Sequence, residues 1–126
     1  LYQGIRIMPR FEVVEEQIPE ALKIVLYRVM QEALSNAAKH SGAQEVQVIL
    51  GLREGWLEMT VSDDGSGFDP ERVMGAGDTL SGFGIHSMRQ RVEICNGRFE
   101  IRSRVGQGTR IRVRLPLEAG DGEDPV

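Results

Sequence analysis

The sequence predicts a two-layer α/β sandwich, α+β in the broader sense, with helices on one face of a β-sheet. Extended and helical patterns follow one another in the order strand, helix, hairpin, loop, helix and hairpin, which is typical of this architecture. The longest helical pattern places its apolar residues three and four positions apart. The last two extended segments alternate apolar and polar residues, as expected of strands with one covered face.

The two helices are expected to end at glycine-containing stop signals. The first runs from Pro19 to about His40 and stops at Ser41-Gly42, and the second runs from Ile85 to Ile94 and stops at Asn96-Gly97. The apolar stripe of the first helix consists of Leu22, Val25, Leu26, Val29 and Ala33. Strands are expected over Ile5–Val14 with a break at Pro9, Val46–Leu52, Trp56–Ser62, Phe99–Arg104 and Thr109–Leu115.

The chain of 126 residues is short enough for one domain. We expect this domain to cover residues 1–117, followed by a disordered acidic tail at 118–126. The stretch from Asp63 to Gly84 holds six of the fifteen glycines and shows little periodicity. We expect a long mobile loop there, and loops of this length inside compact domains are usually functional.

Composition excludes several classes of protein. Forty per cent hydrophobic and 27% charged residues are ordinary globular values, and no apolar run is long enough for a membrane helix. The net charge of −4 argues against direct contact with nucleic acid, which would require a clustered basic face. The single cysteine, Cys95, fits a reducing compartment. A cytoplasmic domain without direct membrane contact is therefore expected.

A polar group interrupts the apolar stripe of the first helix. Glu32, Asn36 and His40 fall within roughly 80° of arc at about 100° per residue, on the side that also carries the apolar residues. A buried carboxylate and amide need partners, and hydrated Mg²⁺ would supply them. Lys39 could offer a point charge to a phosphate. A helix edge that meets solvent is the alternative, and for this motif alone it is the commoner arrangement.

Three glycine-rich motifs follow. Asp63-Asp64-Gly65-Ser66-Gly67 comes directly after a strand, where a carboxylate could accept the amine of a purine. Gly82-Phe83-Gly84-Ile85 opens the second helix, whose amides could bind phosphate. Gly106-Gln107-Gly108-Thr109 joins the last two strands. A plain turn, a flexible helix entry and a hairpin turn explain these motifs equally well when each is taken alone.

The order of the four motifs resembles the signature of the Bergerat-fold ATPases. Glu-x-x-x-Asn on a helix, Asp-x-Gly-x-Gly, Gly-x-Gly before a helix and Gly-x-Gly-Thr occur in that order between about residue 20 and Leu117. The superfamily includes histidine kinases, type II topoisomerases, heat-shock chaperones and mismatch-repair proteins. "QEALSNAAKHS" and "GFGIHSMRQRV" resemble the nitrate-sensor and DesK-like branch of sensor histidine kinases. The resemblance implies a mixed, mostly antiparallel sheet and a flexible ATP lid.

The resemblance implies a role for each polar residue of the first motif. Asn36 matches the residue that coordinates the Mg²⁺ bridging the phosphates. Glu32 matches the position that activates water in hydrolysing relatives, and in a kinase it would order a metal-bound water. Lys39 and His40 would lie near the phosphates, with Lys39 the better match.

The resemblance also implies how the adenine end of ATP is held. Asp63 would accept the adenine amine, and Thr109 would complete that end through a water. Asp64 departs from the asparagine usual at its position. Backbone contacts with the nucleotide are expected at Gly65, Gly67, Gly82, Gly84, Ile85 and Gly108.

The reaction implied by the resemblance is transfer of the γ-phosphoryl group of ATP to a histidine on a separate dimerisation domain. Neither His40 nor His86 is a plausible acceptor, so we expect this chain alone to be nearly inactive. The resemblance also implies that dimerisation uses the separate domain, so we expect this chain alone to be mainly monomeric. A response regulator with a helix-turn-helix output domain is the expected partner. Alternatives are a hydrolysing ATPase, a serine kinase of the anti-sigma-factor type, or a non-catalytic nucleotide-sensing docking module.

Overall fold

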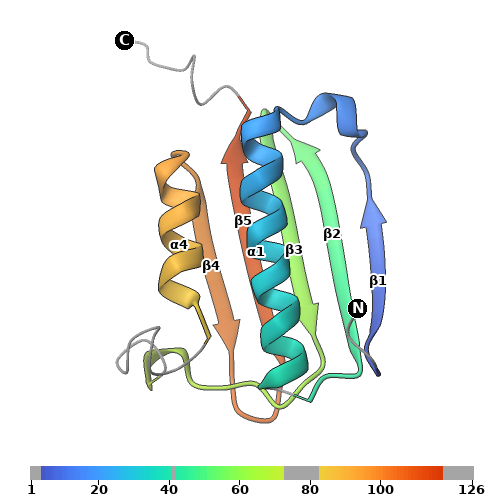
Figure 1. Cartoon of the computed structure of the whole chain (residues 1–126), viewed down its shortest axis with the longest axis vertical. Helices are drawn as coiled ribbons and strands as arrows, with labels where there is room; N and C mark the ends of the chain where they lie inside the picture. Colours follow the sequence, from blue (N-terminus) through green and yellow to red (C-terminus); the bar gives the residue numbers. More distant parts are fainter. Residues whose placement is uncertain (1–3, 41, 73–82, 118–126) are drawn as a thin grey trace.

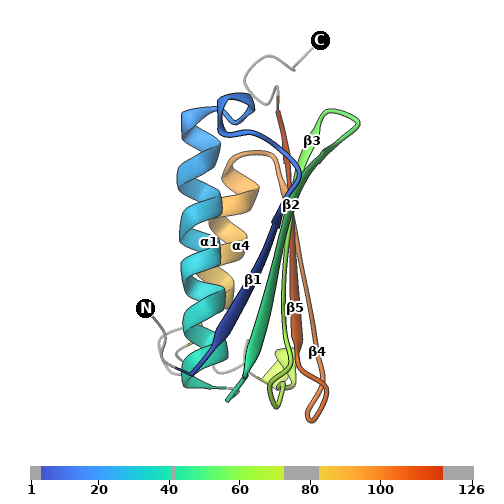
Figure 2. The same cartoon turned by 90° about the vertical axis from the view of Figure 1, so that its right-hand side faces the viewer.

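The computed structural model describes residues 4–40, 42–72 and 83–117. Their elements follow in the order β1 (Arg6–Phe11), a 3-10 turn η1 (Glu15–Gln17), α1 (Glu20–Lys39), β2 (Glu45–Arg53), β3 (Trp56–Asp63), α4 (Ile85–Ile94), β4 (Arg98–Ser103) and β5 (Thr109–Pro116). The strands form one sheet in the order β1-β2-β3-β5-β4. Both helices lie on the same face of this sheet, so the predicted two-layer sandwich is confirmed (Figures 1 and 2).

The sheet is mixed and mostly antiparallel, as expected. Among the described strands, only β1 and β2 pair in parallel, and α1 makes the crossover between them (Figure 1). The pairs β2–β3, β3–β5 and β4–β5 are antiparallel. The β2–β3 connection is a two-residue turn in which Glu54 and Gly55 both have positive φ, of 52° and 82°. Such turns match the twist of the strands that they join.

The predicted break at Pro9 is wrong, because β1 runs through it. Proline lacks an N–H and is tolerated in edge strands where its nitrogen faces away from the neighbouring strand. The amide of Arg6 donates to the carbonyl of Gln44, directly before β2, at 2.8 Å, and the amide of Glu12 donates to that of Leu50 in β2 at 2.7 Å. Since backbone N–H groups alternate in direction along a strand, the nitrogen of Pro9 faces the free edge, and no bond to β2 is lost.

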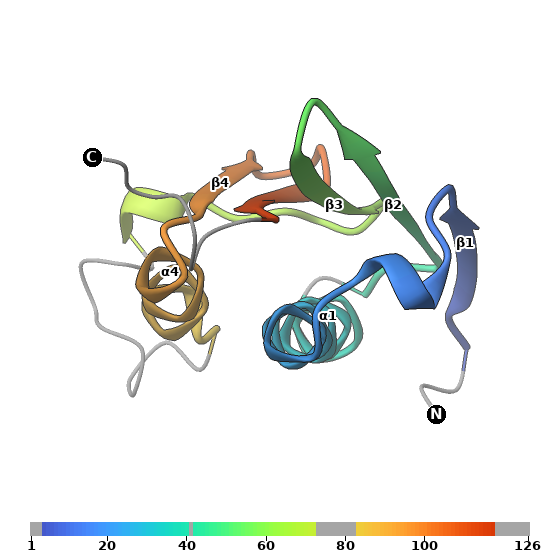
Figure 3. The ribbon, with the colours of Figure 1, turned by 90° about the horizontal axis from the view of Figure 1, so that it is seen from above.

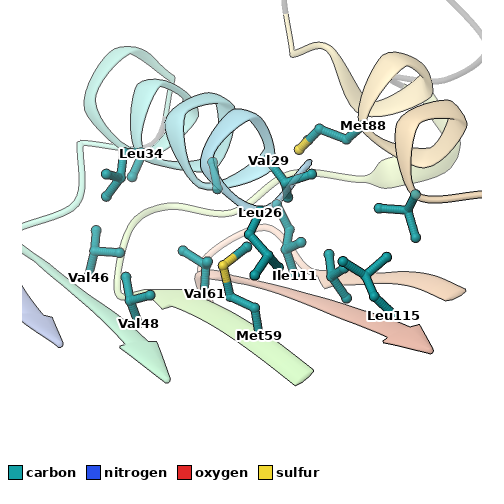
Figure 4. Close-up of a cluster of buried hydrophobic side chains, with 14 of the residues drawn as sticks. Leu26, Val29, Leu34, Val46, Val48, Met59, Val61, Met88, Ile111 and Leu115 are labelled. Carbon is teal, nitrogen blue, oxygen red and sulfur yellow. The ribbon is translucent and has the colours of Figure 1, made fainter. Parts of the chain in front are cut away.

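The core lies between α1, α4 and the sheet (Figures 3 and 4). Alternate residues of β3 and β5 point into it, including Leu57, Val113 and Leu115, which are fully buried. Val29 on α1 and Ile85 on α4 cover them and are equally buried. The periodicity of the sequence thus identified the correct faces. No helix in the described part of the chain is long and apolar enough to cross a membrane.

Contrary to the sequence prediction, the connection from β3 to α4 is not irregular throughout. Residues 70–72 adopt helical conformation within the stretch expected to be irregular. Pro70 begins this turn, as suits a residue with a fixed φ and no N–H. Ser41, residues 73–82 with the predicted Gly82, and the predicted tail at 118–126 lie outside the described residues.

Candidate functional site

The four sequence motifs meet at one end of the sandwich. The motif that opens α4 is described from Phe83 onward. The C-terminal turns of α1, the end of β3, the start of α4 and the turn between β4 and β5 all lie there (Figure 1). A cavity between them is lined by Ala33, Asn36, Val61, Asp63, Phe68, Phe83, Ile101, Thr109 and Ile111. The fold therefore gathers residues that are up to 78 positions apart, between Ala33 and Ile111.

Asn36 is a buried polar residue at the wall of this cavity. It is 8% exposed, and its Nδ2 donates a hydrogen bond of 2.8 Å to the carbonyl oxygen of Phe83. Its Oδ1 is buried and has no hydrogen-bond partner. A buried acceptor without a partner is costly, and it is a suitable oxygen ligand for a divalent cation. The residue therefore fits the metal-binding position that the sequence assigned to it.

Glu32 lies one helical turn before Asn36 and meets the start of α4. Gly84 is the N-cap of α4 with φ of 65°, and a Cβ built on it would lie 2.8 Å from the Glu32 carboxyl carbon. A negative charge is favourable at a helix N-terminus, where the backbone dipoles are positive. The Glu32 carboxylate thus occupies the end of α4 at which the sequence predicted phosphate contacts, and Ile85, the first residue of α4, is fully buried.

His40 does not turn inward with Asn36. The helix α1 ends at Lys39, and His40 is its exposed C-cap residue. The His40 ring stacks on the Phe83 ring with centroids 4.2 Å apart, and Phe83 contacts Phe68 at 4.6 Å. Lys39 is also exposed and makes no ion pair with any described residue.

The aromatic rings close the cavity. Its free volume is only about 10 Å³, which is room for at most one water molecule. Phe68 and Phe83 both line it, so a planar base can enter only if these rings move. Sequence reasoning did not assign a role to either ring. The aromatic residues next to Gly67 and Gly84 were the available signal.

Asp63 stands at the end of β3 opposite Thr109. These two residues pair across the strands, which places both side chains on the cavity side of the sheet. Asp63 Oδ1 accepts a hydrogen bond of 2.8 Å from the Gly65 amide. Gly108 approaches Asp63 so closely that an added Cβ would lie 2.3 Å from its carbonyl oxygen. Glycine at position 108 is therefore required by packing.

Ser103 orients the Thr109 hydroxyl, which sequence reasoning missed. Ser103 Oγ donates to the Gly108 carbonyl at 3.1 Å, accepts from the Phe68 amide at 2.8 Å, and lies 2.8 Å from Thr109 Oγ1. A hydroxyl has only one hydrogen, so Thr109 is the donor in the last pair. Thr109 Oγ1 then keeps its acceptor lone pairs.

Asp64 has a structural task. Its Oδ1 accepts hydrogen bonds from the amides of Gln44 and Glu45 at 2.9 and 3.0 Å. These two backbone amides, first that of Glu45 and then that of Gln44, hold the pKa of Asp64 below its ordinary value of 3.8. The carboxylate therefore ties the end of β3 to the start of β2.

Gly67 joins the loop after β3 to the turn between β4 and β5. Its φ is 68°, and an added Cβ would lie 2.0 Å from the carbonyl oxygen of Arg104. The Gly106 amide donates to the Ser66 carbonyl in the same contact. The second and fourth sequence motifs are thus in direct backbone contact, which explains why glycine recurs in both.

The fold and these contacts define an ATP-binding domain. The sequence matches the family of histidine kinase-, DNA gyrase B- and HSP90-like ATPases over residues 21–119, and the chain belongs to this family. Among solved structures, it resembles the blue-light activated histidine kinase of Erythrobacter litoralis EL346, with a TM-score of 0.72 over 90% of this chain and 36% of that one, at 23% identity. The histidine kinase domain of the same protein gives a TM-score of 0.71 over 92% of this chain and 53% of that one, at 23% identity.

Relatives by sequence are bacterial sensor kinases. The chain is 35% identical over 116 residues to the sensor histidine kinase LiaS of Bacillus subtilis, covering 90% of this chain and 31% of that protein. It is 31% identical over 106 residues to the signal transduction histidine-protein kinase/phosphatase DegS of the same organism, covering 84% of this chain and 27% of that protein. The chain thus spans about a third or less of the length of these relatives.

Proposed function

We propose that residues 1–117 form the catalytic domain of a sensor histidine kinase, which binds Mg·ATP and donates its γ-phosphoryl group to a histidine on a separate dimerisation domain. The observation that carries this proposal is the buried Oδ1 of Asn36, which has no hydrogen-bond partner. Asn36 lines the same cavity as Asp63 and Thr109. Burial of an unsatisfied acceptor opposes folding, so a ligand for this oxygen accounts for it best.

Asp63 and Thr109 form the adenine end of the proposed site. Asp63 Oδ1 accepts the Gly65 amide, which fixes the orientation of the carboxylate, and a carboxylate can accept a hydrogen bond from an exocyclic amine. Thr109 presents an acceptor oxygen beside it. Since Phe68 and Phe83 fill the cavity, entry of the base requires the Phe83 ring to leave its stacked position on His40.

Asn36, Glu32 and Lys39 form the phosphate end. When bound through Asn36 Oδ1, Mg²⁺ would neutralise phosphate charge. Glu32 would order a metal-bound water from its place against Gly84, and Lys39, on the exposed side of the helix end, would reach a phosphate as a point charge. Positioning and charge neutralisation carry most of the rate in phosphoryl transfer. The bond from the γ-phosphorus to ADP breaks, a bond to the acceptor imidazole nitrogen forms, and ADP leaves.

Calorimetry with a non-hydrolysable ATP analogue tests the site. Binding should depend on Mg²⁺ in the wild type and should weaken at least tenfold in Asp63→Ala and Asn36→Ala. Asp69→Ala and Gln31→Ala remove the same groups at exposed positions and serve as matched controls with unchanged affinity. Absence of binding at millimolar nucleotide would refute the proposal and favour a non-catalytic docking module.

The phosphoacceptor lies on another domain in this proposal. The isolated chain should bind ATP yet phosphorylate itself barely, since His86 is exposed in the first turn of α4 and His40 is stacked on Phe83. Addition of the histidine-bearing dimerisation domain should restore phosphoryl transfer. Substantial self-phosphorylation of this chain would contradict the proposal. A response regulator, of the helix-turn-helix output type, would then receive the group in the cytoplasm. The wording of the motifs supports the nitrate-sensor and DesK-like branch.

Exposed apolar side chains support contact with the dimerisation domain. Phe11, Val14, Ile24 and Tyr27 are between 55% and 59% exposed, and Phe11 and Tyr27 border an apolar groove of about 190 Å³ between α1 and the sheet. Exposed apolar patches mark interaction sites. Ile24→Asp should reduce phosphorylation of the added dimerisation domain while nucleotide affinity stays unchanged.

A second activity, ATP hydrolysis, is favoured by one observation, the position of the Glu32 carboxylate at the start of α4. A carboxylate near the γ-phosphate could act as a general base for water. If this chain is a hydrolase, it should release phosphate without any protein acceptor, and Glu32→Gln should abolish that release. A kinase domain should release almost none.

A further inference from the structure

The outer face of the sheet, away from both helices, is rich in arginine. Figure 2 shows that both helices lie on the other face, and the registers of β3, β5 and β4 place three cross-strand rows on the outer face. These rows are Glu58-Arg114-Arg98, Thr60-Arg112-Glu100 and Ser62-Arg110-Arg102. Arg104 follows the last residue of β4 at the same end. We call the six arginines 98, 102, 104, 110, 112 and 114 the arginine face.

The net charge of the arginine face is opposite in sign to that of the whole chain. Its six arginines and the two glutamates of the same rows carry a net +4, whereas the whole chain carries −4, which leaves −8 for the remainder. The net charge had argued against direct contact with nucleic acid, which would require a clustered basic face. The antiparallel pairing of β4 and β5 creates such a face from arginines at alternate positions.

The arginines are paired unevenly. Glu58 lies within 3.3 Å of Arg112 and 3.0 Å of Arg114, and Glu100 lies 3.3 Å from Arg102. Arg104 and Arg110 make no ion pair with a carboxylate in the described ranges. Arg98, at the opposite end, also makes no ion pair with a described carboxylate, but its row contains Glu58, whereas the row Ser62-Arg110-Arg102 contains no carboxylate. The surplus of positive charge is therefore larger at the end of the face near the turn between β4 and β5.

A groove of about 380 Å³ lies at this end, lined among others by Ser62, Arg102, Arg104, Gln107 and Arg110. The volume is within the range of ligand-binding clefts. Arg102 and Arg110 are directly opposite each other across the two strands, and like charges in that relation destabilise a sheet. Folding alone does not favour this arrangement, whereas an anionic ligand between the guanidinium groups would stabilise it.

We propose that this groove binds an acidic segment of a partner protein through its aspartate or glutamate carboxylates. Arginine matches a carboxylate with two parallel hydrogen bonds, and Ser62 and Gln107 add neutral polar groups beside the guanidinium groups. The groove is also lined by Asp63 and Thr109, which line the cavity of the nucleotide site as well, so the bound segment would lie beside that cavity, against the guanidinium groups of the outer face.

Nucleic acid fits the groove less well for two reasons. Binding of single strands uses open aromatic faces, but the Trp56 ring is covered by the guanidinium groups of Arg114 and Arg98, at 4.9 and 5.8 Å from its centroid. The remainder of the chain carries −8 and would repel a long polyanion. A short acidic segment avoids this repulsion because it contacts the arginine face alone.

Fluorescence anisotropy with a labelled peptide of alternating glutamate and alanine, at low ionic strength, tests the proposal. The double variant Arg102→Gln/Arg110→Gln should bind at least tenfold more weakly than the wild type. Arg28→Gln/Arg53→Gln changes the net charge equally at exposed positions outside the groove and should bind within twofold of the wild type. Affinity for the ATP analogue should be unchanged in both variants, so this test is separate from that of the nucleotide site.

Four results would overturn the proposal. Absence of peptide binding is the first, and an equal loss in both double variants, which would indicate unspecific attraction, is the second. Tighter binding of a single-stranded oligonucleotide or of vesicles rich in anionic lipid would assign the groove to phosphates. Self-association of the wild type, measured by sedimentation and lost in Arg102→Gln/Arg110→Gln, would assign it to a second copy of the chain.

Discussion

Replacement of Asn36 by leucine should separate nucleotide binding from stability. The change removes the buried Oδ1 without a partner, which relieves about 1–3 kcal/mol. It also removes the 2.8 Å hydrogen bond to the Phe83 carbonyl, at a cost of about 1 kcal/mol, and leaves that carbonyl without this donor, at a similar cost. Leucine has nearly the same size and adds apolar burial. The free energy of unfolding without nucleotide should therefore change by no more than about 1 kcal/mol.

Urea denaturation with and without Mg·ATP measures both effects. Nucleotide at a hundred times its Kd should stabilise the wild type by about 2.7 kcal/mol and should stabilise Asn36→Leu hardly at all. Gln31→Leu makes the same substitution on the exposed side of α1 and should behave as the wild type in both conditions. A loss of more than about 3 kcal/mol in Asn36→Leu without nucleotide would mean that Oδ1 has a partner in the folded protein. Retained dependence on Mg²⁺ would refute the metal-binding role.

Three further outcomes are expected. Gly106 and Gly67 both have positive φ, but a Cβ added at Gly106 meets no atom within 4 Å. Gly106→Ala should therefore lower the free energy of unfolding by only about 1–2 kcal/mol, whereas Gly67→Ala should lower it by several kcal/mol more. Equal losses of stability in the two variants would contradict the backbone contact at Gly67. The pKa of Asp64 is lowered, so its contribution to stability is present above its ordinary pKa and lost as the pH falls through the lowered value. Asp64→Asn, measured by urea midpoints between pH 7 and 3, should lose less stability in acid, and an identical pH profile would refute this. Phe83→Ala opens the closed cavity, and calorimetry should show about two- to tenfold tighter binding of the ATP analogue. The reason is that entry of the base no longer breaks the contact of the Phe83 ring with His40, and one aromatic contact contributes about 0.5–1.5 kcal/mol. Weaker binding would show that the ring holds the nucleotide.

Most of the fold could be predicted because periodicity reports which faces are covered. The alternation in β5 places Ile111, Val113 and Leu115 in the core, and the stripe on α1 identified its buried side. That β1 continues through Pro9 could not be predicted in the same way. It depends on the direction of its nitrogen, which is fixed by the register with β2 and not by the residue itself.

The candidate site could be predicted in part for the same reason. Asn36 was detectable as a polar residue on an apolar stripe, and it is buried as expected. Contacts between distant segments, such as the Glu32 carboxylate against Gly84 and the Phe83 ring over the cavity, leave no periodic signal. The arginine face was hidden because only the pairing of β4 with β5 makes it continuous.

The orientation of Pro9 also affects the behaviour of the domain in concentrated solution. An edge strand offers a row of unpaired amides to which a strand of another molecule can add. Along the free edge of β1, Pro9 has no N–H to donate, and the exposed Arg6 and Arg10 place charge on the same strand. Proline and charged side chains are common protections of this kind. The residue that seemed to interrupt the strand thus protects the domain against growth of its sheet from one molecule to the next.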